Sequence, residues 1–186
     1  STDLAGKAGV PTQQHFQAAV LRTRRIDPKA PRPYDNELIP AVAKRTTRPG
    51  LIRKEFPGQF PWVPQFNQLK PSGRSVVKGL IPATGTQQFS GYLRVPQSGV
   101  YRFALTTNGK AIVRLHHALL INADTNYAAG TSALSGKIPL QAGIHPISIH
   151  YLPNDLNVNL SLQWQLPGGK MEDISPKHFS CHKGEL

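Results

Sequence analysis

Few side chains in residues 51–186 could perform acid–base chemistry. This stretch holds six carboxylates: Glu55, Asp124, Asp155, Glu172, Asp173 and Glu185. Glycoside hydrolysis needs two carboxyl groups about 5–10 Å apart, and no pair in the sequence predicts that geometry. Glu172 and Asp173 are neighbours, but they follow a Pro-Gly-Gly segment and are expected on a solvated loop. We therefore expect a noncatalytic chain, and a small hydrolase with convergent carboxylates stays the alternative.

Three potential zinc ligands cluster near the C-terminus, where His178, Cys181 and His182 form a His-x-x-Cys-His motif. Zinc accepts such ligands, but three groups on a terminal tail lack a fourth partner. We expect residues 181–186 to form a polar tail and no metal site, with zinc binding as the alternative. Cys181 is the only cysteine, so an internal disulfide is impossible.

The other conspicuous histidines are expected to have structural or solvated positions. His116 and His117 are adjacent, so an extended backbone would point them to opposite faces and they could not ligate one ion. We expect this pair at a solvated hairpin tip. His145 precedes a proline and is expected to be structural.

The chain is strongly basic, with a net charge of +12 from 22 Lys and Arg against 10 Asp and Glu. Such a surface attracts polyanions such as nucleic acid, anionic lipid or sulfated glycan, although it can also lack a dedicated ligand. Nucleic acid is not expected, because no helix-turn-helix, zinc-finger or ribonucleoprotein motif is present. No segment approaches the ~20 consecutive apolar residues of a membrane span.

Strands must position these side chains, and residues 89–103 give the strongest strand pattern. Phe89, Leu93 and Val95 share one face of a first segment, and Tyr101 and Phe103 share one face of a second. Alternation of this kind around a Pro-Gln-Ser-Gly turn predicts a half-buried β-hairpin.

Similar short segments recur from residue 50 onward. The pattern predicts strands at residues 51–56, 74–80, 86–95, 99–106, 110–115, 118–121, 136–140, 144–152 and 158–164. About nine short strands indicate an all-β domain over residues 50–180, an antiparallel sandwich or barrel. Residues 1–49 read instead as a basic, irregular, Pro-rich arm or linker, with possible short helices at 13–25 and 37–44.

The order of motifs in residues 50–180 resembles the lectin-like β-barrel domain named after the anthrax protective antigen. The match rests on Phe-x-Gly-Tyr-Leu-x-Val-Pro-x-Ser-Gly-x-Tyr-x-Phe from residue 89, Leu-Gln-Ala-Gly-Ile-His-Pro-Ile from residue 140, and Leu-x-Leu-x-Trp from residue 160. The resemblance implies an extracellular or periplasmic, noncatalytic, carbohydrate-binding accessory module, of a kind that also occurs in larger glycan-degrading enzymes.

One departure from that family concerns calcium. Its sugar-binding adhesins carry adjacent aspartates in the loop after the Tyr-x-Phe strand, and these hold a calcium ion that coordinates sugar hydroxyls. Here the loop reads Thr-Thr-Asn-Gly-Lys over residues 106–110. Calcium prefers several carboxylate or carbonyl oxygens, whereas Lys110 brings a repelling charge. We expect no family-type calcium site and no other cofactor.

The basic residues instead indicate an anionic or sulfated glycan, or another polyanion, as the ligand. We expect Asn108, Asp124 and Asn126 to bond sugar hydroxyls, Tyr127 to offer a ring, and Lys110 and Arg114 to attract negative charge. Trp62 lies between prolines and is expected to cap the barrel, and if exposed it could stack on a sugar ring.

An alternative from another functional class is a structural or protein-interaction domain without sugar binding. In that case residues 1–49 would dock a partner domain or subunit. Residues 1–11 also bear a slight resemblance to a segment of the type I sulfatase fold, but the sulfatase nucleophile motif is absent. That resemblance would make the chain an accessory part and not the catalyst.

Overall fold

The computed structural model describes residues 37–124, 131–154 and 158–184. Backbone contacts divide the chain into two units, Ser1–Glu37 and Leu38–Leu186, and the second unit is described here by itself. The expected helix at residues 13–25 lies outside the described residues. Among the described helices, none is long and apolar enough to cross a membrane.

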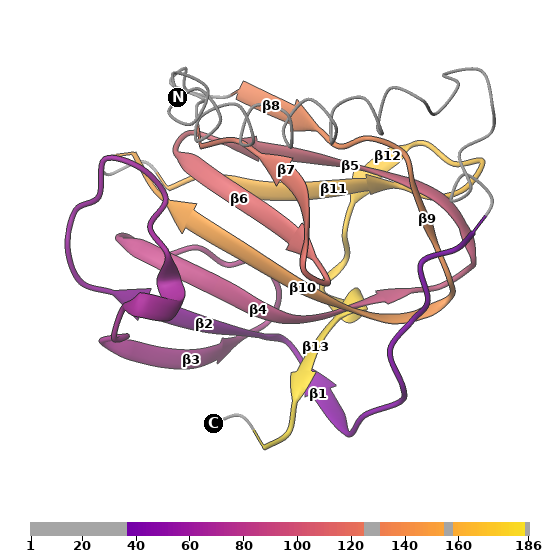
Figure 1. The fold of residues 1–186 in the computed structure, drawn as a ribbon, viewed down its shortest axis with the longest axis horizontal. Coiled ribbons are helices and arrows are strands. Elements are labelled where there is room, and N and C mark those ends of the chain that lie inside the picture. The colour runs from indigo at the N-terminus through magenta and orange to yellow at the C-terminus, as the bar shows by residue number, and fades with distance from the viewer. Residues whose placement is uncertain (1–36, 125–130, 155–157, 185–186) are drawn as a thin grey trace, which may run out of the picture. The chain divides into compact units, whose positions relative to one another are not determined.

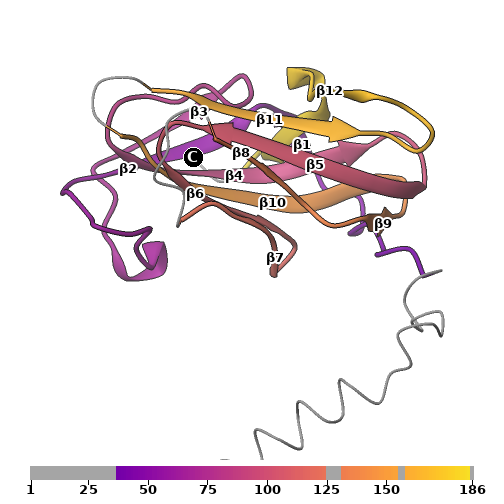
Figure 2. The same ribbon diagram turned by 90° about the horizontal axis from the view of Figure 1, so that it is seen from above.

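Residues 38–184 form two antiparallel sheets, which confirms the expected all-β fold as a β-sandwich (Figure 1). The strands of the larger, eight-stranded sheet are β1 (Thr47–Pro49), β13 (Phe179–His182), β4 (Thr86–Val95), β10 (Gly143–Leu152), β6 (Lys110–Leu115), β7 (Ala118–Asn122), β2 (Leu51–Phe56) and β3 (Gly73–Val77). Those of the smaller, five-stranded sheet are β12 (Met171–Asp173), β11 (Leu160–Gln165), β5 (Gly99–Thr107), β8 (Thr131–Leu134) and β9 (Ile138–Leu140). Seen from above, β5 and β11 lie in one layer and β4, β10 and β6 in the other (Figure 2).

The core lies between the two sheets and follows from the alternation in the sequence. In β11, Leu160, Leu162 and Trp164 are buried, while the residues between them are only half-buried. β10 alternates in the same way along most of its length. Because side chains of a strand point to opposite faces in turn, each sheet presents one apolar face to the other. Two short 3₁₀ helices, η1 (Phe66–Gln68) and η2 (Pro176–His178), lie in the connections.

The expected hairpin of residues 86–106 is wrong, although both of its strands exist. β4 pairs with β2, β10 and β13, whereas β5 pairs with β8, β9 and β11. The turn at Pro96–Ser98 therefore carries the chain from one sheet to the other, and the Tyr101 hydroxyl donates to the Gln97 carbonyl across it (2.7 Å). Alternation reports which face of a strand is buried, and it does not report which strand is the partner.

β6 and β7 do form a hairpin, but its tip is not simply solvated as expected. His116 has a φ of 55° in the turn and is half-buried. Its Nε2 atom lies 2.8 Å from Nδ1 of the fully buried His145, whose Nε2 lies 2.8 Å from the Gln141 carbonyl oxygen. Because a carbonyl only accepts, His145 donates from Nε2 and accepts from His116 at Nδ1. Burial lowers the pKa of both rings.

Both ends of the expected domain also need correction. Residues 37–44 form no helix, since Ile39 donates to the Pro139 carbonyl (2.8 Å) and Val42 to the Ile144 carbonyl (2.9 Å). The compact unit therefore begins at Leu38, before the expected boundary at residue 50. At the other end, β13 extends through the first two residues of the expected polar tail, 181–186, and Cys181 is fully buried.

Gly91 allows β4 and β13 to approach closely, and we predict that a side chain here destabilises the sandwich. A Cβ at Gly91 would lie 2.4 Å from the Ser180 carbonyl oxygen and 2.8 Å from Leu51 Cδ2. Overpacking of this kind costs ~1–3 kcal/mol, so Gly91→Ala should lower the urea midpoint by a corresponding amount. The matched control is Gly136→Ala, because nothing lies within 4 Å of a Cβ there. Equal midpoints for the two variants would contradict this packing argument.

Candidate functional site

A cleft of about 500 Å³ opens at one end of the sandwich. Four connections meet there: β2–β3, β3–β4, β5–β6 and β10–β11. The described residues that line it are Gly58, Gln59, Phe60, Pro61, Gly85, Thr86, Asn108, Gly109, Lys110, Leu152, Pro153 and Asn154. Two residues of the expected binding loop, Asn108 and Lys110, are thus placed at a concave surface.

Asn108 and Gly109 build one wall of this cleft. The Asn108 side-chain oxygen accepts hydrogen bonds from the Tyr151 hydroxyl and the Asn159 amide, both at 3.1 Å. A Cβ at Gly109 would lie only 2.2 Å from the Leu152 carbonyl oxygen. Glycine is therefore required at position 109, because the backbone of Leu152 lies so close. The Asn108-Gly109 pair connects β5 of the smaller sheet to β6 of the larger sheet, so it does not form the turn of a hairpin.

The opposite wall is the start of the β2–β3 connection, and a small apolar cluster holds this connection in place. Phe56, Val63 and Phe66 are buried together, separately from the main core. The rings of Phe56 and Phe66 meet edge to face with centroids 4.7 Å apart, a favourable aromatic geometry. Because this cluster also packs against Ile112 and Leu152, it anchors the connection to β6 and β10.

Lys110 links the two walls. Its ammonium group donates a hydrogen bond to the Pro61 carbonyl oxygen in the β2–β3 connection. Lys110 is half-buried, so its four-carbon stem contacts the protein while its charge lies at the cleft. The residue therefore supplies a positive charge to the cleft and fixes the segment next to Trp62.

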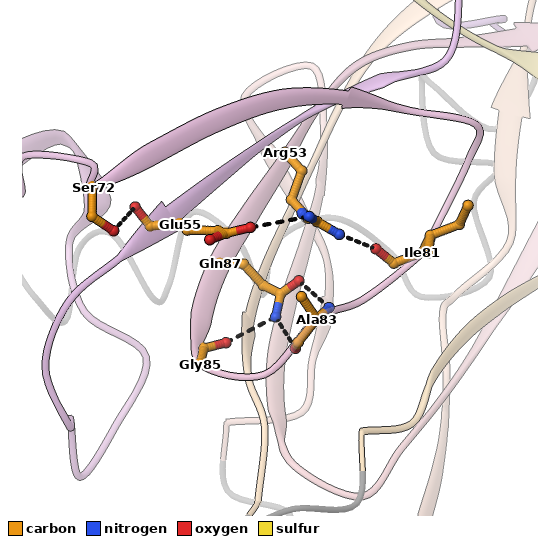
Figure 3. Close-up of polar contacts among 7 residues, drawn as sticks. All are labelled: Arg53, Glu55, Ser72, Ile81, Ala83, Gly85 and Gln87. Carbon is orange, nitrogen blue, oxygen red and sulfur yellow. Dashed lines mark hydrogen bonds and ion pairs between the residues drawn. The ribbon is translucent and has the colours of Figure 1, made fainter.

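A buried amide shapes a third part of the rim, the end of the β3–β4 connection (Figure 3). Gln87 is fully buried. Its side-chain oxygen accepts from the Ala83 amide (2.8 Å), and its side-chain nitrogen donates to the carbonyls of Ala83 and Gly85 (2.8 Å for Gly85). These bonds satisfy the whole buried group and hold Gly85 against the cleft.

Arg53 ties the same connection to β2. Its Nη1 donates to the Ile81 carbonyl and its Nη2 to the Glu55 carboxylate, both at 3.0 Å (Figure 3). The Ser72 hydroxyl also donates to the Glu55 backbone carbonyl (3.2 Å). Two connections that border the cleft are thereby cross-linked through one strand.

The sequence predicts that Trp62 caps the barrel, and this prediction is wrong. In the structure, Trp62 exposes 64% of its surface. It follows Pro61, which lines the cleft, and Val63, its other neighbour, is buried in the apolar cluster. The local alternation therefore buries Val63 and presents the indole to solvent. An exposed aromatic beside a polar cleft is the arrangement in which a ring can stack on a ligand.

The remaining expected site residues lie in different places. Asp124 is half-buried and accepts a hydrogen bond from the Val63 amide (2.9 Å), so it supports the Trp62 segment from behind. Arg114 lies opposite Ser148 in the middle of the larger sheet and does not line the cleft. Asn126 and Tyr127 lie outside the described residues.

His150 lies beneath the β2–β3 connection and has a strongly perturbed pKa. Its ring centroid is 4.4 Å from that of Phe66, and its Nε2 atom is 3.1 Å from the side-chain nitrogen of Gln88. Burial, followed by the nearby positive charge of Arg114, lowers the pKa of His150 to about 4. The neutral imidazole therefore packs against Phe66 and helps to hold the β2–β3 connection, which forms one wall of the cleft.

In the described part of the chain, no group of three or more His, Cys, Asp or Glu side chains could hold a metal ion. The three side chains considered as alternative zinc ligands have separate surroundings. His178 Nδ1 lies 3.1 Å from the Arg94 carbonyl oxygen, Cys181 is buried, and His182 Nδ1 accepts from the Gly184 amide (3.0 Å). The carboxylate of Asp124, near the cleft, accepts a hydrogen bond from the backbone amide of Val63.

Several cleft residues were not expected from the sequence. Phe60, Thr86, Pro153 and Asn154 line the cleft, but each occurs alone in a connection or at a strand end. The available signal was the Pro- and Gly-rich composition of residues 57–64, which predicts irregular backbone on a surface. Only the packing of the sheets reveals that these connections meet.

We predict that acid weakens the cleft wall through His150. Because the folded-state pKa is below the ordinary value near 6.5, the unfolded state binds a proton first as the pH falls. The stability that neutral His150 supports is complete above about pH 6.5 and is lost progressively toward about pH 4. The free energy of unfolding of His150→Gln should therefore fall less steeply over this range, as measured by urea titration. The exposed His117→Gln serves as control, and parallel profiles for all three proteins would refute the assignment.

Comparison with known proteins supports this description of the fold. A family model, the PA14 domain, matches residues 80–178, just over half of the chain. The structure is similar to an anti-sigma factor domain-containing protein from Clostridium clariflavum, with 17% identity and a TM-score of 0.57. That match covers 77% of this chain and 51% of the other, so the chain spans about half the length of that structure. No curated protein matched the chain.

Two further solved structures are covered almost completely. The PA14 domain of the antifreeze protein MpAFP has 12% identity and a TM-score of 0.58, with 78% of this chain and 97% of that chain covered. A subtype-switched epithelial adhesin 9 A domain from Candida glabrata, in complex with β-lactose, has 11% identity and a TM-score of 0.57, with 80% and 96% covered. Identities this low establish a common fold only. The family model, which matches more than half of the sequence, shows that the chain belongs to the PA14 domain family, and the shared fold agrees with this.

Proposed function

We propose that this domain binds carbohydrate at the cleft bordered by Asn108 and Lys110, as a noncatalytic accessory module of a larger extracellular or periplasmic protein. The observation that carries the proposal is a cleft lined by polar and apolar groups, with the exposed Trp62 indole directly following Pro61 of its lining. A sugar ring has apolar C–H faces and a polar rim of hydroxyls. An exposed aromatic ring and nearby polar groups complement these two properties.

The walls of the cleft are suited to this role because they are largely pre-formed. Backbone and side-chain hydrogen bonds of Asn108, Lys110 and Gln87 hold three of the connections in place. A pre-organised site loses little conformational freedom when it binds a small ligand. The adhesin A domain with the same fold was solved with β-lactose, which makes a galactose-containing oligosaccharide a suitable first probe.

We further propose that binding needs no calcium and favours anionic sugars. Lys110 places an ammonium group at the cleft, where calcium would be repelled and a sulfate or carboxylate attracted. The net charge of +12 adds a general attraction for anionic glycans. Glycan-degrading activity, if any, would then belong to another part of the larger protein.

Replacing Trp62 tests the site directly. Binding should first be surveyed on an array of neutral and sulfated oligosaccharides that includes lactose, with calcium or with EDTA. In titration calorimetry with the best ligand, Trp62→Ala should weaken binding about fivefold, since aromatic contacts contribute roughly 1 kcal/mol. The thermal midpoint should change little, because the indole is mostly exposed.

Leu119→Ala is the matched control, since Leu119 is also a large exposed apolar residue but lies in β7, outside the connections that line the cleft. Equal affinities for both variants would remove Trp62 from the site. If the array shows no glycan binding under either condition, the carbohydrate proposal is wrong and a protein-interaction role replaces it.

Salt should separate the charge contribution from sugar recognition. Raising the ionic strength from about 0.05 M to about 0.5 M shortens the Debye length several-fold. The affinity for a sulfated oligosaccharide should therefore fall at least several-fold, while that for its neutral counterpart stays nearly constant. Affinity for the sulfated form that is insensitive to salt would exclude an electrostatic preference.

A further inference from the structure

A second cleft of about 490 Å³ lies away from the first, beside β1 and β13. β1 and the start of β13 form one side of it, with Arg48, Phe179 and Ser180 among the lining residues. Arg94 of β4 and Lys177 of η2 form another side, and Lys78 follows the end of β3. Segments from both ends of the sandwich domain and from its middle thus meet here.

The charge of this cleft is strongly one-sided. Four of its described lining residues are cationic, namely Arg48, Lys78, Arg94 and Lys177, and none is acidic. The ion pair found within the described part of the chain, Arg53 with Glu55, involves none of these four cations. Four positive charges around one concavity raise the local concentration of anions.

Arg48 and Ser180 also present buried donors that lack a partner. The Nε and Nη2 atoms of Arg48 are buried without a hydrogen bond to any described residue, and so is the Ser180 hydroxyl. Ser180 is only 6% exposed, and it and Arg48 both line the cleft. Buried polar groups without partners are uncommon and unfavourable. Arg53 Nε and Arg102 Nε are in the same state outside this cleft, so an external group is indicated by these donors only together with the four cations.

The chemistry of the missing group follows from these donors. A guanidinium and a hydroxyl beside three further cations match the oxygens of a sulfate or phosphate group, which accept several charge-assisted hydrogen bonds. Pro49 and Pro176, both exposed, give the cleft an apolar portion as well. The carrier of the anionic group should therefore present an apolar surface next to its charge.

We propose that this second cleft binds a sulfate group on a glycan chain and forms a subsite separate from the cleft beside Trp62. The assignment of sulfate on a sugar rests on the proposed carbohydrate function, whereas the oxyanion site itself does not. Single-stranded nucleic acid is less suitable, because such binding relies on exposed aromatic rings and the ring in this cleft, Phe179, is 2% exposed.

The test uses the full chain and a highly sulfated heparin-type oligosaccharide, with its desulfated form and a single-stranded oligonucleotide for comparison. Lys78→Ala/Lys177→Ala removes two exposed cations of the cleft without touching the core. We expect its affinity for the sulfated probe to fall at least tenfold. The slope of log affinity against log salt should decrease by about one to two, because fewer counterions are released.

The matched control is Lys137→Ala/Lys170→Ala, which removes two exposed lysines outside the cleft. Its affinity should change less than twofold, and an equal loss in both double variants would overturn the site in favour of general charge attraction. A third variant, Ser180→Ala, should weaken binding of the sulfated probe while the circular dichroism spectrum stays unchanged. Unchanged binding by this variant would remove the hydroxyl from the site.

Two further outcomes separate this inference from the proposed function. If Trp62→Ala weakens binding of a neutral sugar about fivefold and the sulfated probe still binds with sensitivity to Lys78 and Lys177, both clefts act as proposed. If the desulfated probe binds as tightly as the sulfated one in the native protein, the sulfate subsite is refuted, although the Trp62 cleft stands. Tighter binding of the oligonucleotide, lost in the Lys78→Ala/Lys177→Ala variant, would overturn the assignment to a glycan while retaining an oxyanion site.

Discussion

The burial of one apolar face of each sheet against the other is the constraint on which the remaining structure depends. Tyr101, Phe103 and Trp164 come from the smaller sheet and are at most 1% exposed, and the ring centroids of Tyr101 and Trp164 lie 5.6 Å apart. The larger sheet contributes Phe89 and Ile149 to the same core. Burial on this scale is the main favourable contribution to folding. Once the faces are fixed, the ends and edges of the sheets are left to irregular segments, and both clefts lie there.

The two clefts differ because the segments that form them are held in different ways. The cleft beside Trp62 has walls tied by side-chain hydrogen bonds of Gln87 and Asn108. Its polar groups are therefore largely engaged by the protein, and an exposed ring offers the main surface for a ligand. The cleft beside β13 instead contains Arg48 and Ser180 with buried donors that no described residue satisfies. One surface is thus complementary to the face of a sugar ring and the other to an oxyanion.

Most strands were predictable from the sequence, but the short strands β1, β8, β12 and β13 were missed, and most pairings were not predictable. Leu160, Leu162 and Trp164 alternate with polar residues, and this local pattern is sufficient to place a half-buried strand. The separation of β4 from β5 depends on competition among strands far apart in the chain, which no local pattern encodes. The same reasoning applies to the sites. The Asn108-Gly109 pair lies in a loop that the sequence already indicates as a binding loop, but the place of the buried Gln87 amide and of Arg48 and Ser180 at the two clefts depends on contacts between distant segments.

The few carboxylates of the described domain explain why cations and aromatic rings carry its recognition chemistry. Glu55 pairs with Arg53 within β2, Asp124 accepts from the backbone of the Trp62 segment, and Asp173 accepts from the Gln163 side chain (2.9 Å). Each of these three acids stabilises a strand or a connection. Because acids used in this way do not neutralise the lysines and arginines elsewhere, positive charge accumulates at the surface. A scaffold built from few acids therefore attracts anionic ligands, and the position of each cleft decides which part of such a ligand it contacts.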